Sequence, residues 1–242
     1  MKIGIVVFPG SNCDHDMAWL YHSQLGQDVA MLWHRDSDVG DVDVIIVPGG
    51  FSFGDYLRTG ALAKLSPIMG AVKRFAENGG PVIGICNGFQ ILCEAGLLPG
   101  VLLQNRRMKF LSRPVTVKVE NVSTPFTRGF STGELFNCPV AHFDGNYFLE
   151  PHALDDLEQN NQVVFRYASA DGKVDEHCQE SNPNGSCNSI AGVCNKAGNV
   201  VGLMPHPERA AERIVDQVIV DQAIVDQVNA ASGRKVFEAL VV

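Results

Sequence analysis

The chain has 242 residues, and its formal net charge is −8 at pH 7. This length allows a single large domain with its own core. The acidic balance argues against nucleic acid as a partner, because phosphate binding requires a basic surface. No signal peptide is evident, and no apolar run reaches the about 18 residues that a membrane-spanning helix needs. Together with an odd count of 7 cysteines, these features predict a cytoplasmic protein with neither a nucleic-acid nor a membrane partner.

Strand and helix patterns alternate through roughly the first hundred residues. Apolar, β-branched runs at residues 3–8 and 42–47 predict buried parallel strands, and residues 28–33 form a weaker third. Helical periodicity lies between them, near residues 14–25 and 61–78. Such alternation predicts a doubly wound α/β sheet whose functional site lies at the carboxyl ends of the strands.

Short β-branched runs dominate from residue 101 to about residue 200, for example at residues 115–119. They predict antiparallel strands and long loops that are appended to the same domain. Residues 176–189 are rich in Asn, Ser, Gly and Cys, a composition typical of a surface loop. We expect no metal there, since the cysteines are spaced too widely and irregularly for a zinc site.

Residues 214–228 carry an unusual repeat, in which Ile-Val-Asp-Gln recurs every five residues. A five-residue step advances a helix by about 140°, so the apolar side chains do not gather on one face. An odd period also moves successive repeats to opposite faces of a strand. Two interpretations stay open: a locally duplicated, loosely packed helix, or a segment that a partner buries.

The segment around Cys86 has the pattern of a nucleophile at a strand-to-helix turn. A short apolar strand at residues 82–85 leads into the cysteine, and Gly84 and Gly88 flank it in a G-x-C-x-G arrangement. Such a turn places the side chain at the N-terminus of the next helix, where N–H groups and the helix dipole favour an anion. A thiol there loses its proton more readily, and the thiolate is the nucleophile. The alternative is a buried core cysteine, which the two glycines disfavour.

A base for this thiol is available at His206. Residues 200–204 predict a strand, and the prolines on both sides of His206 keep the following residues extended. His206 and Glu208 therefore project to the same side, as a base and the carboxylate that orients it. His142 is the competing candidate for the base, because it lies in a Gly-containing turn beside Asp144.

An oxyanion hole is predicted where a buried strand at residues 44–47 ends in Pro-Gly-Gly. Without side chains, the glycines let a backbone N–H approach a ligand closely. The N–H groups of Gly50 and of Asn87, the residue after the nucleophile, are the predicted donors to a developing oxyanion.

Together these motifs resemble those of class I (triad) glutamine amidotransferases. Pro-Gly-Gly, Gly-Ile-Cys-Asn-Gly-Phe-Gln and Pro-His-Pro-Glu occur in the order and spacing of that family. Three longer segments are similar to the glutaminase subunits of phosphoribosylformylglycinamidine synthase, namely residues 8–14, 49–58 and 198–210. The resemblance runs from Met1 to about Ala211. It implies a flavodoxin-like, doubly wound and mostly parallel α/β sheet with appended antiparallel strands, in a single domain over residues 1–242 with an atypical tail at about 212–242.

The resemblance also implies a reaction. Cys86 attacks the side-chain amide of L-glutamine, which gives a glutamyl thioester and ammonia. His206 protonates the leaving ammonia and then activates water, while Glu208 orients the His206 ring.

Four further residues match positions of the family's site. Gly50 and Asn87 correspond to the oxyanion hole, and Gln90 and Phe51 correspond to contacts with the substrate glutamine. Residues 141–146 depart from the family pattern, since a more glycine-rich His-Gly-Glu-Gly is expected there.

The acceptor of the ammonia is expected on another chain. The sequence contains no G-x-x-x-x-G-K-[ST] motif and leaves no second domain for ATP. The resemblance implies a separate synthetase subunit, PurL, which binds ATP and magnesium, and a small PurS subunit, with no cofactor in this chain. Such a complex converts formylglycinamide ribonucleotide to formylglycinamidine ribonucleotide in purine biosynthesis.

Three rival functions remain. A cysteine elbow also suits other hydrolases of this architecture, which the Pro-His-Pro-Glu segment disfavours. A glutaminase of another pathway is disfavoured by the Asn-Cys-Asp and Phe-Ser-Phe-Gly-Asp segments. A non-catalytic binding module would be expected to lack Cys86, His206 or Glu208, and all three are present.

Overall fold

The computed structural model describes residues 1–211 and 232–241, so the five-residue repeat lies outside the described residues. The strands are β1 (Lys2–Val7), β2 (Asp28–Trp33), β3 (Val44–Val47), β4 (Val82–Ile85), β5 (Val101–Leu103), β6 (Leu111–Val119), β7 (Leu135–His142), β8 (Asn146–Phe148), β9 (Val163–Ala168), β10 (Ile190–Cys194) and β11 (Val200–Leu203). The α-helices are α1 (Asp14–Trp19), α2 (Pro67–Glu77), α3 (Asn87–Glu94), α4 (Pro151–Gln159) and α6 (Lys235–Val241). The short helical turns are η1 (Leu20–Gln24), η2 (Ser52–Asp55), η3 (Ala63–Leu65), η4 (Cys187–Ser189), η5 (Pro207–Ala210) and η6 (Ser232–Arg234).

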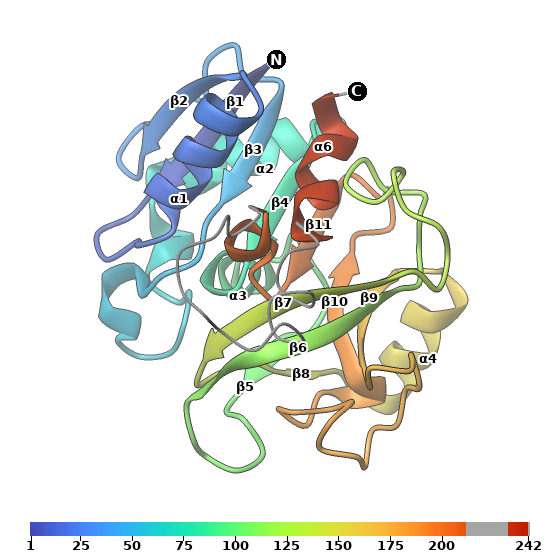
Figure 1. Cartoon of the computed structure of the whole chain (residues 1–242). Helices are drawn as coiled ribbons and strands as arrows, with labels where there is room; N and C mark the ends of the chain where they lie inside the picture. The colour runs from blue at the N-terminus through green and yellow to red at the C-terminus, as the bar shows by residue number, and fades with distance from the viewer. Residues whose placement is uncertain (212–231, 242) are drawn as a thin grey trace, which may run out of the picture.

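Within the described residues, nine strands form one sheet in the order β2-β1-β3-β4-β11-β10-β9-β6-β7. Neighbouring strands are parallel from β2 to β11 and antiparallel from β11 to β7. Helices α1 and α6 lie on one side of the parallel strands, and α2 and α3 lie on the other (Figure 1). The sheet confirms the expected doubly wound α/β architecture with appended antiparallel strands.

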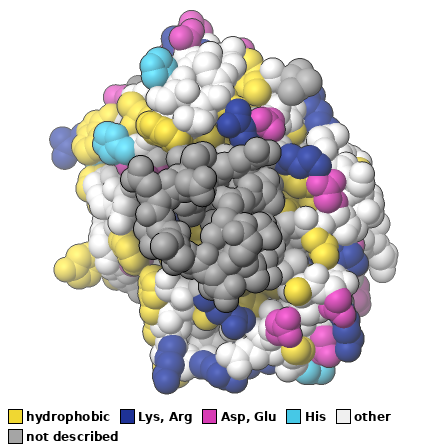
Figure 2. Space-filling model, viewed as in Figure 1, with side chains coloured by type: hydrophobic (Ala, Val, Ile, Leu, Met, Phe, Trp, Pro, Cys, Tyr) yellow, Lys and Arg dark blue, Asp and Glu magenta, His cyan; other side chains and the backbone are white. Residues whose placement is uncertain are grey.

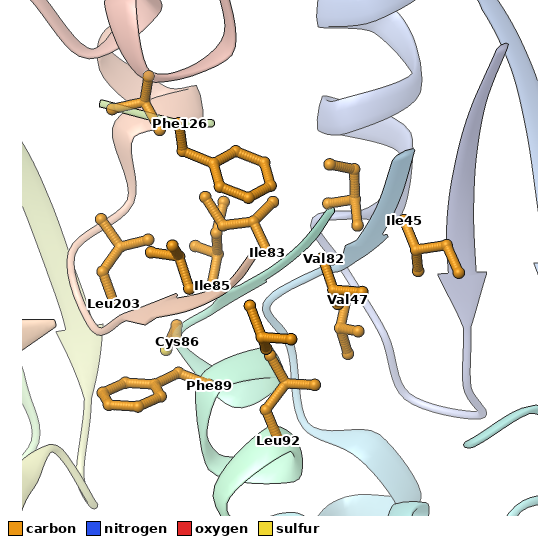
Figure 3. Close-up of a cluster of buried hydrophobic side chains, with 14 of the residues drawn as sticks. Ile45, Val47, Val82, Ile83, Ile85, Cys86, Phe89, Leu92, Phe126 and Leu203 are labelled. Carbon is orange, nitrogen blue, oxygen red and sulfur yellow. The ribbon is translucent and has the colours of Figure 1, made fainter. Parts of the chain in front are cut away.

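The central parallel strands are buried on both faces. Every residue of β3, β4 and β11 is buried, which explains why their sequences are continuous apolar runs instead of alternating patterns. Figure 3 shows Ile83 and Phe126 on one side of β4, with Phe89 and Leu92 of α3 on the other. This two-sided packing fixes the carboxyl ends of the strands, where the candidate site lies.

The two expected helices of the first half are shorter than their sequence patterns indicate. Helix α1 passes into the π-helical turn η1, so together they cover the pattern near residues 14–25. The pattern near residues 61–78 becomes a regular helix only at Pro67, because proline suits the first turn of a helix but not its interior.

The loop at residues 176–189 is not the simple surface loop that its composition indicates. Asn184 and Ser186 are buried, and Asn184 Nδ2 donates to the carbonyl of Gly145 at 2.7 Å. Ser186 Oγ accepts a hydrogen bond from the Tyr147 N–H at 3.1 Å. The polar residues of the loop therefore satisfy buried backbone groups of the β7–β8 connection, which lies beside the candidate site.

Helix α6 packs into the core. Val236 and Phe237 of α6 are fully buried, and the Phe237 ring meets the Tyr21 ring edge-on at a centroid distance of 5.8 Å. Arg128 Nε donates to the α6 carbonyl of Ala239 at 2.5 Å. Helix α6 thus covers the same side of the sheet as α1 (Figure 1).

The described surface is mixed in charge. Lys and Arg side chains are interspersed with Asp and Glu side chains on the face shown in Figure 2. Within residues 1–211 and 232–241, no helix has the length and apolar character that crossing a membrane requires.

Candidate active site

Cys86 lies at a strained turn between β4 and α3. Its backbone has φ 51° and ψ −107°, a conformation that non-glycine residues rarely adopt. A side chain on Gly88 would place its Cβ 1.8 Å from the Val47 carbonyl oxygen, and one on Gly84 would meet Gly88 at 2.7 Å. The two flanking glycines therefore let α3 approach the ends of β3 and β4, as the sequence pattern predicts.

The Cys86 side chain is buried and contacts the hydrophobic core at the end of the sheet. Figure 3 shows it at the end of β4, between Ile85 and Phe89. Its Sγ lies 3.7 Å from the carbonyl oxygen of Ala141 on β7. The Cys86 N–H donates to the Leu203 carbonyl at 2.8 Å, which joins the elbow to the end of β11.

His206 and Glu208 follow β11 and form a buried pair. His206 is extended, with φ −106° and ψ 82°, and its N–H donates to the Pro139 carbonyl at 2.8 Å. Its Nδ1 donates to Oε1 of Glu208 at 2.6 Å, and both side chains are almost fully buried. Because β11 is parallel to β4 and adjacent to it, this pair and Cys86 meet at the same end of the sheet.

The surroundings of His206 favour its protonated form. Burial alone lowers the pKa of a histidine, but the Glu208 carboxylate and the Cys86 thiol raise the pKa of His206 well above its usual value. Nε2 is buried and has no hydrogen-bond partner among the described residues. Since Nδ1 is held by Glu208, Nε2 is the nitrogen left for Cys86 and for a reacting group.

His142 has a different environment. Its Nδ1 donates to Oδ1 of Asn105 at 3.0 Å, and Oδ1 also accepts the Gly145 N–H at 3.2 Å. Burial, reinforced by His206, lowers the pKa of His142 to about 3, so the ring is neutral. His142 therefore fits a structural role in the turn at residues 141–146 better than the role of base.

Gly50 and Asn87 follow two adjacent parallel strands, β3 and β4. Gly50 follows β3, which is parallel to β4, and its φ of 146° would be strained for other residues. A Cβ on Gly50 would lie 2.7 Å from the Asn12 nitrogen. Neither the Gly50 N–H nor the Asn87 N–H donates a hydrogen bond within the described residues. Both groups are thus free to donate to a ligand.

Of the two predicted glutamine contacts, Gln90 belongs to a polar cluster at the start of α3. Gln90 Nε2 donates to the Asp144 carbonyl at 2.5 Å, and its Oε1 accepts from Asn87 Nδ2 at 2.9 Å. Asn87 Nδ2 also lies 3.3 Å from Oδ1 of Asp55. Burial and the nearby Asp144 carboxylate raise the pKa of Asp55 to about 6. Phe51 stands apart from this cluster as a half-exposed ring at the rim.

The sequence does not predict the cluster that Cys13 and Arg209 form beside His206. Cys13 Sγ lies 4.0 Å from His206 Nδ1, and Arg209 Nη2 donates to the same sulfur at 3.1 Å. The Asn-Cys-Asp motif marks Cys13 as unusual but says nothing of its neighbours. Within the described residues, ligand atoms of Cys13, His206 and Glu208 lie within 4.8 Å of one another, and these are residue types that bind zinc.

Comparisons with known proteins agree with this geometry. A family model described as a CobB/CobQ-like glutamine amidotransferase domain matches residues 1–241. Phosphoribosylformylglycinamidine synthase subunit PurQ of Salinibacter ruber is 50% identical over 240 residues, which cover 99% of this chain and 95% of the relative. The subunit of the same name from Koribacter versatilis is 48% identical over 241 residues, with coverage of 100% and 97%.

Solved structures have the same fold. PurLQS from Thermotoga maritima matches with a TM-score of 0.81 and 41% identity, covering 99% of this chain and 97% of that one. The glutaminase domain of Trypanosoma brucei CTPS with bound acivicin matches with a TM-score of 0.53, 14% identity and coverage of 100% and 94%, which shows a shared fold alone. The family match continues to residue 241, so the resemblance does not end near Ala211 as the motifs alone indicate. The chain belongs to the glutamine amidotransferase family.

Proposed function

We propose that this chain is the glutaminase subunit of phosphoribosylformylglycinamidine synthase and that Cys86, His206 and Glu208 are its catalytic triad. The observation that carries the proposal is the convergence of the strained Cys86 elbow and the buried His206–Glu208 pair at the ends of two adjacent parallel strands. Relatives that carry the name of that synthase subunit match the chain over nearly its whole length.

The first half of the reaction is acyl transfer to sulfur. The Cys86 thiolate attacks the side-chain carbonyl carbon of L-glutamine, and the carbonyl oxygen becomes an oxyanion. The N–H groups of Gly50 and Asn87 stabilise this oxyanion by about 3 kcal/mol per donor. The His206 imidazolium gives its Nε2 proton to the departing nitrogen, so the C–N bond breaks and ammonia leaves.

The second half restores the thiol. Neutral His206 takes a proton from water at Nε2 as the water oxygen attacks the thioester carbonyl. The C–S bond breaks, glutamate leaves, and the thiolate–imidazolium pair is restored. Throughout, Glu208 holds the Nδ1 proton and stabilises the imidazolium. Gln90 and Phe51 hold the substrate glutamine from the start of α3 and from the rim.

The ammonia passes to an acceptor on separate partner subunits. We place the chain in a complex with the synthetase subunit PurL and the small PurS subunit, with ATP and magnesium on PurL. There the ammonia converts formylglycinamide ribonucleotide to formylglycinamidine ribonucleotide. All seven cysteines are free thiols, which suits a reducing cytoplasm.

The test is glutaminase kinetics on the isolated chain, followed by stepwise addition of synthetase, ATP and formylglycinamide ribonucleotide. We expect low activity alone and strong activation in the loaded complex, because uncoupled hydrolysis releases ammonia that is protonated in water. A glutamine analogue with an electrophilic side chain should leave one covalent adduct, which peptide mapping should place on Cys86. Mapping to Cys13 or Cys138 would remove Cys86 from its proposed role.

A further inference from the structure

The Nδ1 edge of His206 has a second neighbour besides Glu208. Cys13 is buried, and its Sγ lies 4.0 Å from Nδ1. The ring also lies over Gly49, where a Cβ would meet His206 Cε1 at 2.8 Å and Cys13 Sγ at 3.2 Å. The Cys13 N–H donates to the Gly49 carbonyl at 3.2 Å. The sulfur is therefore fixed against the ring by its own backbone.

Arg209 holds the other side of this sulfur. Its Nη2 donates to Cys13 Sγ at 3.1 Å, and its Nε lies 4.0 Å from Oδ2 of Asp16 on α1. Arg209 belongs to η5, the turn that also carries Glu208. The Cys13 sulfur, which lies near His206 Nδ1, thus links the start of α1 to the segment after β11.

A metal ion does not fit this cluster as it stands. Tetrahedral zinc with bonds of about 2.0 Å would separate its nitrogen and oxygen ligands by roughly 3.3 Å, whereas Nδ1 and Oε1 are 2.6 Å apart. The Arg209 guanidinium already donates a hydrogen bond to the Cys13 sulfur, and its positive charge would repel a divalent cation. The geometry describes a hydrogen-bonded network and not a metal centre.

We propose that Cys13 is a positioning residue for His206, with Arg209 holding its sulfur against the Nδ1 edge of the ring. The inference rests on the proposed role of His206 in glutamine hydrolysis. Sulfur is large and only a weak acceptor. It fills the space beside the ring without taking the Nδ1 proton from Glu208, so Nε2 stays directed at Cys86.

The same network balances charge around the ring. Glu208, Cys86 and Cys13 raise the pKa of His206. The Arg209 guanidinium bonded to Cys13 is expected to lower it, because a like charge disfavours the imidazolium. Two further titratable neighbours among the described residues are neutral, since burial lowers the pKa of His142 to about 3 and raises the pKa of the Cys138 thiol far above its usual value. Cys13 and Arg209 therefore influence His206 in opposite directions.

The experiment compares Cys13→Ala, Cys13→Ser and Arg209→Met in the reconstituted complex with its synthetase. Cys194→Ala is the matched control, because Cys194 is an equally buried thiol on β10. Cys13→Ala should lower kcat by about 10-fold or more through misplacement of the ring, with little change in KM. Cys13→Ser should recover most of this loss, because a hydroxyl still accepts from Arg209. Thermal unfolding verifies that each variant is folded.

The pH dependence of kcat/KM separates positioning from mere packing. The alkaline limb should move to lower pH in Cys13→Ala, since His206 loses a group that favours its protonated form, and to higher pH in Arg209→Met. The readout is the shift of the limb between variants, because the absolute pH of the limb reflects the coupled titration of Cys86 and His206. Cys13→Ala that matches Cys194→Ala in kcat and leaves the limb in place would overturn the proposal.

A second readout keeps this inference distinct from the proposed function. The alkylation rate of Cys86 by iodoacetamide, followed against pH, reports the same Cys86–His206 pair without glutamine. If the native complex does not hydrolyse glutamine, the proposed function fails, and the alkylation profiles still decide the role of Cys13. Opposite shifts in Cys13→Ala and Arg209→Met would support it, and unchanged profiles in both would refute it.

Discussion

At the scale of single residues, the site is a set of side chains whose protonation states differ because their surroundings differ. His206 and His142 are both buried histidines, yet the pKa of His206 is raised by Glu208 and Cys86, while the pKa of His142 falls to about 3. The Glu208 carboxylate beside His206 is the main cause of the difference between the two pKa values. His206 carries a proton that it can donate, and His142 holds a turn through Asn105.

Glu208→Gln should damage the reaction less than His206→Asn. The amide still orients the ring but does not stabilise the imidazolium, so we expect a partial loss of kcat against a loss of several orders of magnitude. Without the carboxylate the pKa of His206 falls, so the alkaline limb of kcat/KM should move to lower pH. Near-normal turnover in His206→Asn, with loss in His142→Asn, would transfer the acid–base role to His142.

Asp55→Asn should stabilise the protein at neutral pH. The folded-state pKa of Asp55 is about 6, above the about 3.9 of an unfolded aspartate. The folded chain therefore binds more protons, and this group lowers stability as pH rises from about 4 to about 6. Because the carboxyl is only half buried, we expect a gain of about 1 kcal/mol in Asp55→Asn. Urea unfolding at pH 7.5 should show this gain, and at pH 3.5 the two proteins should agree.

At the scale of elements, the elbow depends on how closely α3 approaches β3. The glycine at position 88 allows that approach, since its Cα faces the Val47 carbonyl. The start of α3 also contacts the segment after the Pro-Gly-Gly turn, since Ser52 N donates to Asn87 Oδ1 at 3.1 Å. Packing of two elements, and not their separate propensities, thus builds the proposed oxyanion hole.

Gly88→Ala should test this packing. Its Cβ would lie 1.8 Å from the Val47 oxygen, and the backbone atom it meets cannot rotate away. We expect a loss of about 3 kcal/mol in the free energy of unfolding, together with loss of glutaminase activity. Gly70→Ala in α2 is the control, because its nearest neighbour is Arg74 Nη1 at 3.7 Å; it should stabilise the helix by up to about 1 kcal/mol. Equal effects of the two changes would contradict the packing argument.

At the scale of the whole molecule, the sheet brings distant segments together at the carboxyl ends of its parallel strands, and α6 covers the same face of the sheet as α1. Cys13 and His206 are in contact although 193 residues separate them in sequence. The parallel order β1-β3-β4-β11 sets the ends of four strands side by side. The site is therefore a property of the complete sheet.

Phe237→Ala should destabilise the chain by about 3 to 5 kcal/mol, the usual cost of emptying a buried aromatic position. Phe237 is fully buried against Tyr21. Val241→Ala, at a partly buried position on the same helix, should cost far less. Chemical denaturation measures both changes, and equal costs would show that α6 contributes little to the core.

Deletion of residues 212–242 then separates the two interpretations of the repeat. The deletion removes α6, so its stability loss should be at least that of Phe237→Ala, and binding to the synthetase is compared between these two proteins. Binding that is lost in the folded deletion variant but kept in Phe237→Ala would indicate that a partner covers the segment. Equal binding would indicate a locally duplicated, loosely packed helix.

The sequence by itself indicated the parallel strands, the elbow and the residues of the proposed triad, but it did not locate most of the antiparallel strands. A strand made of a continuous apolar run is stable only when both of its faces are buried. The glycines two residues before and after Cys86 allow the strained turn locally. The two prolines around His206 set its extended backbone in the same local way. These features depend on neighbours within a few residues, which is why a pattern reveals them.

Tertiary structure alone decided the rest. The contacts of Cys13 with His206 and Arg209 depend on the order of strands in the sheet. The neutral state of His142 depends on its burial and on the nearby His206. Part of the loop at residues 176–189 is buried, because its side-chain amides and hydroxyls form hydrogen bonds with buried backbone groups. Interactions between segments far apart in sequence leave no periodic trace, because each arises only once the chain has packed.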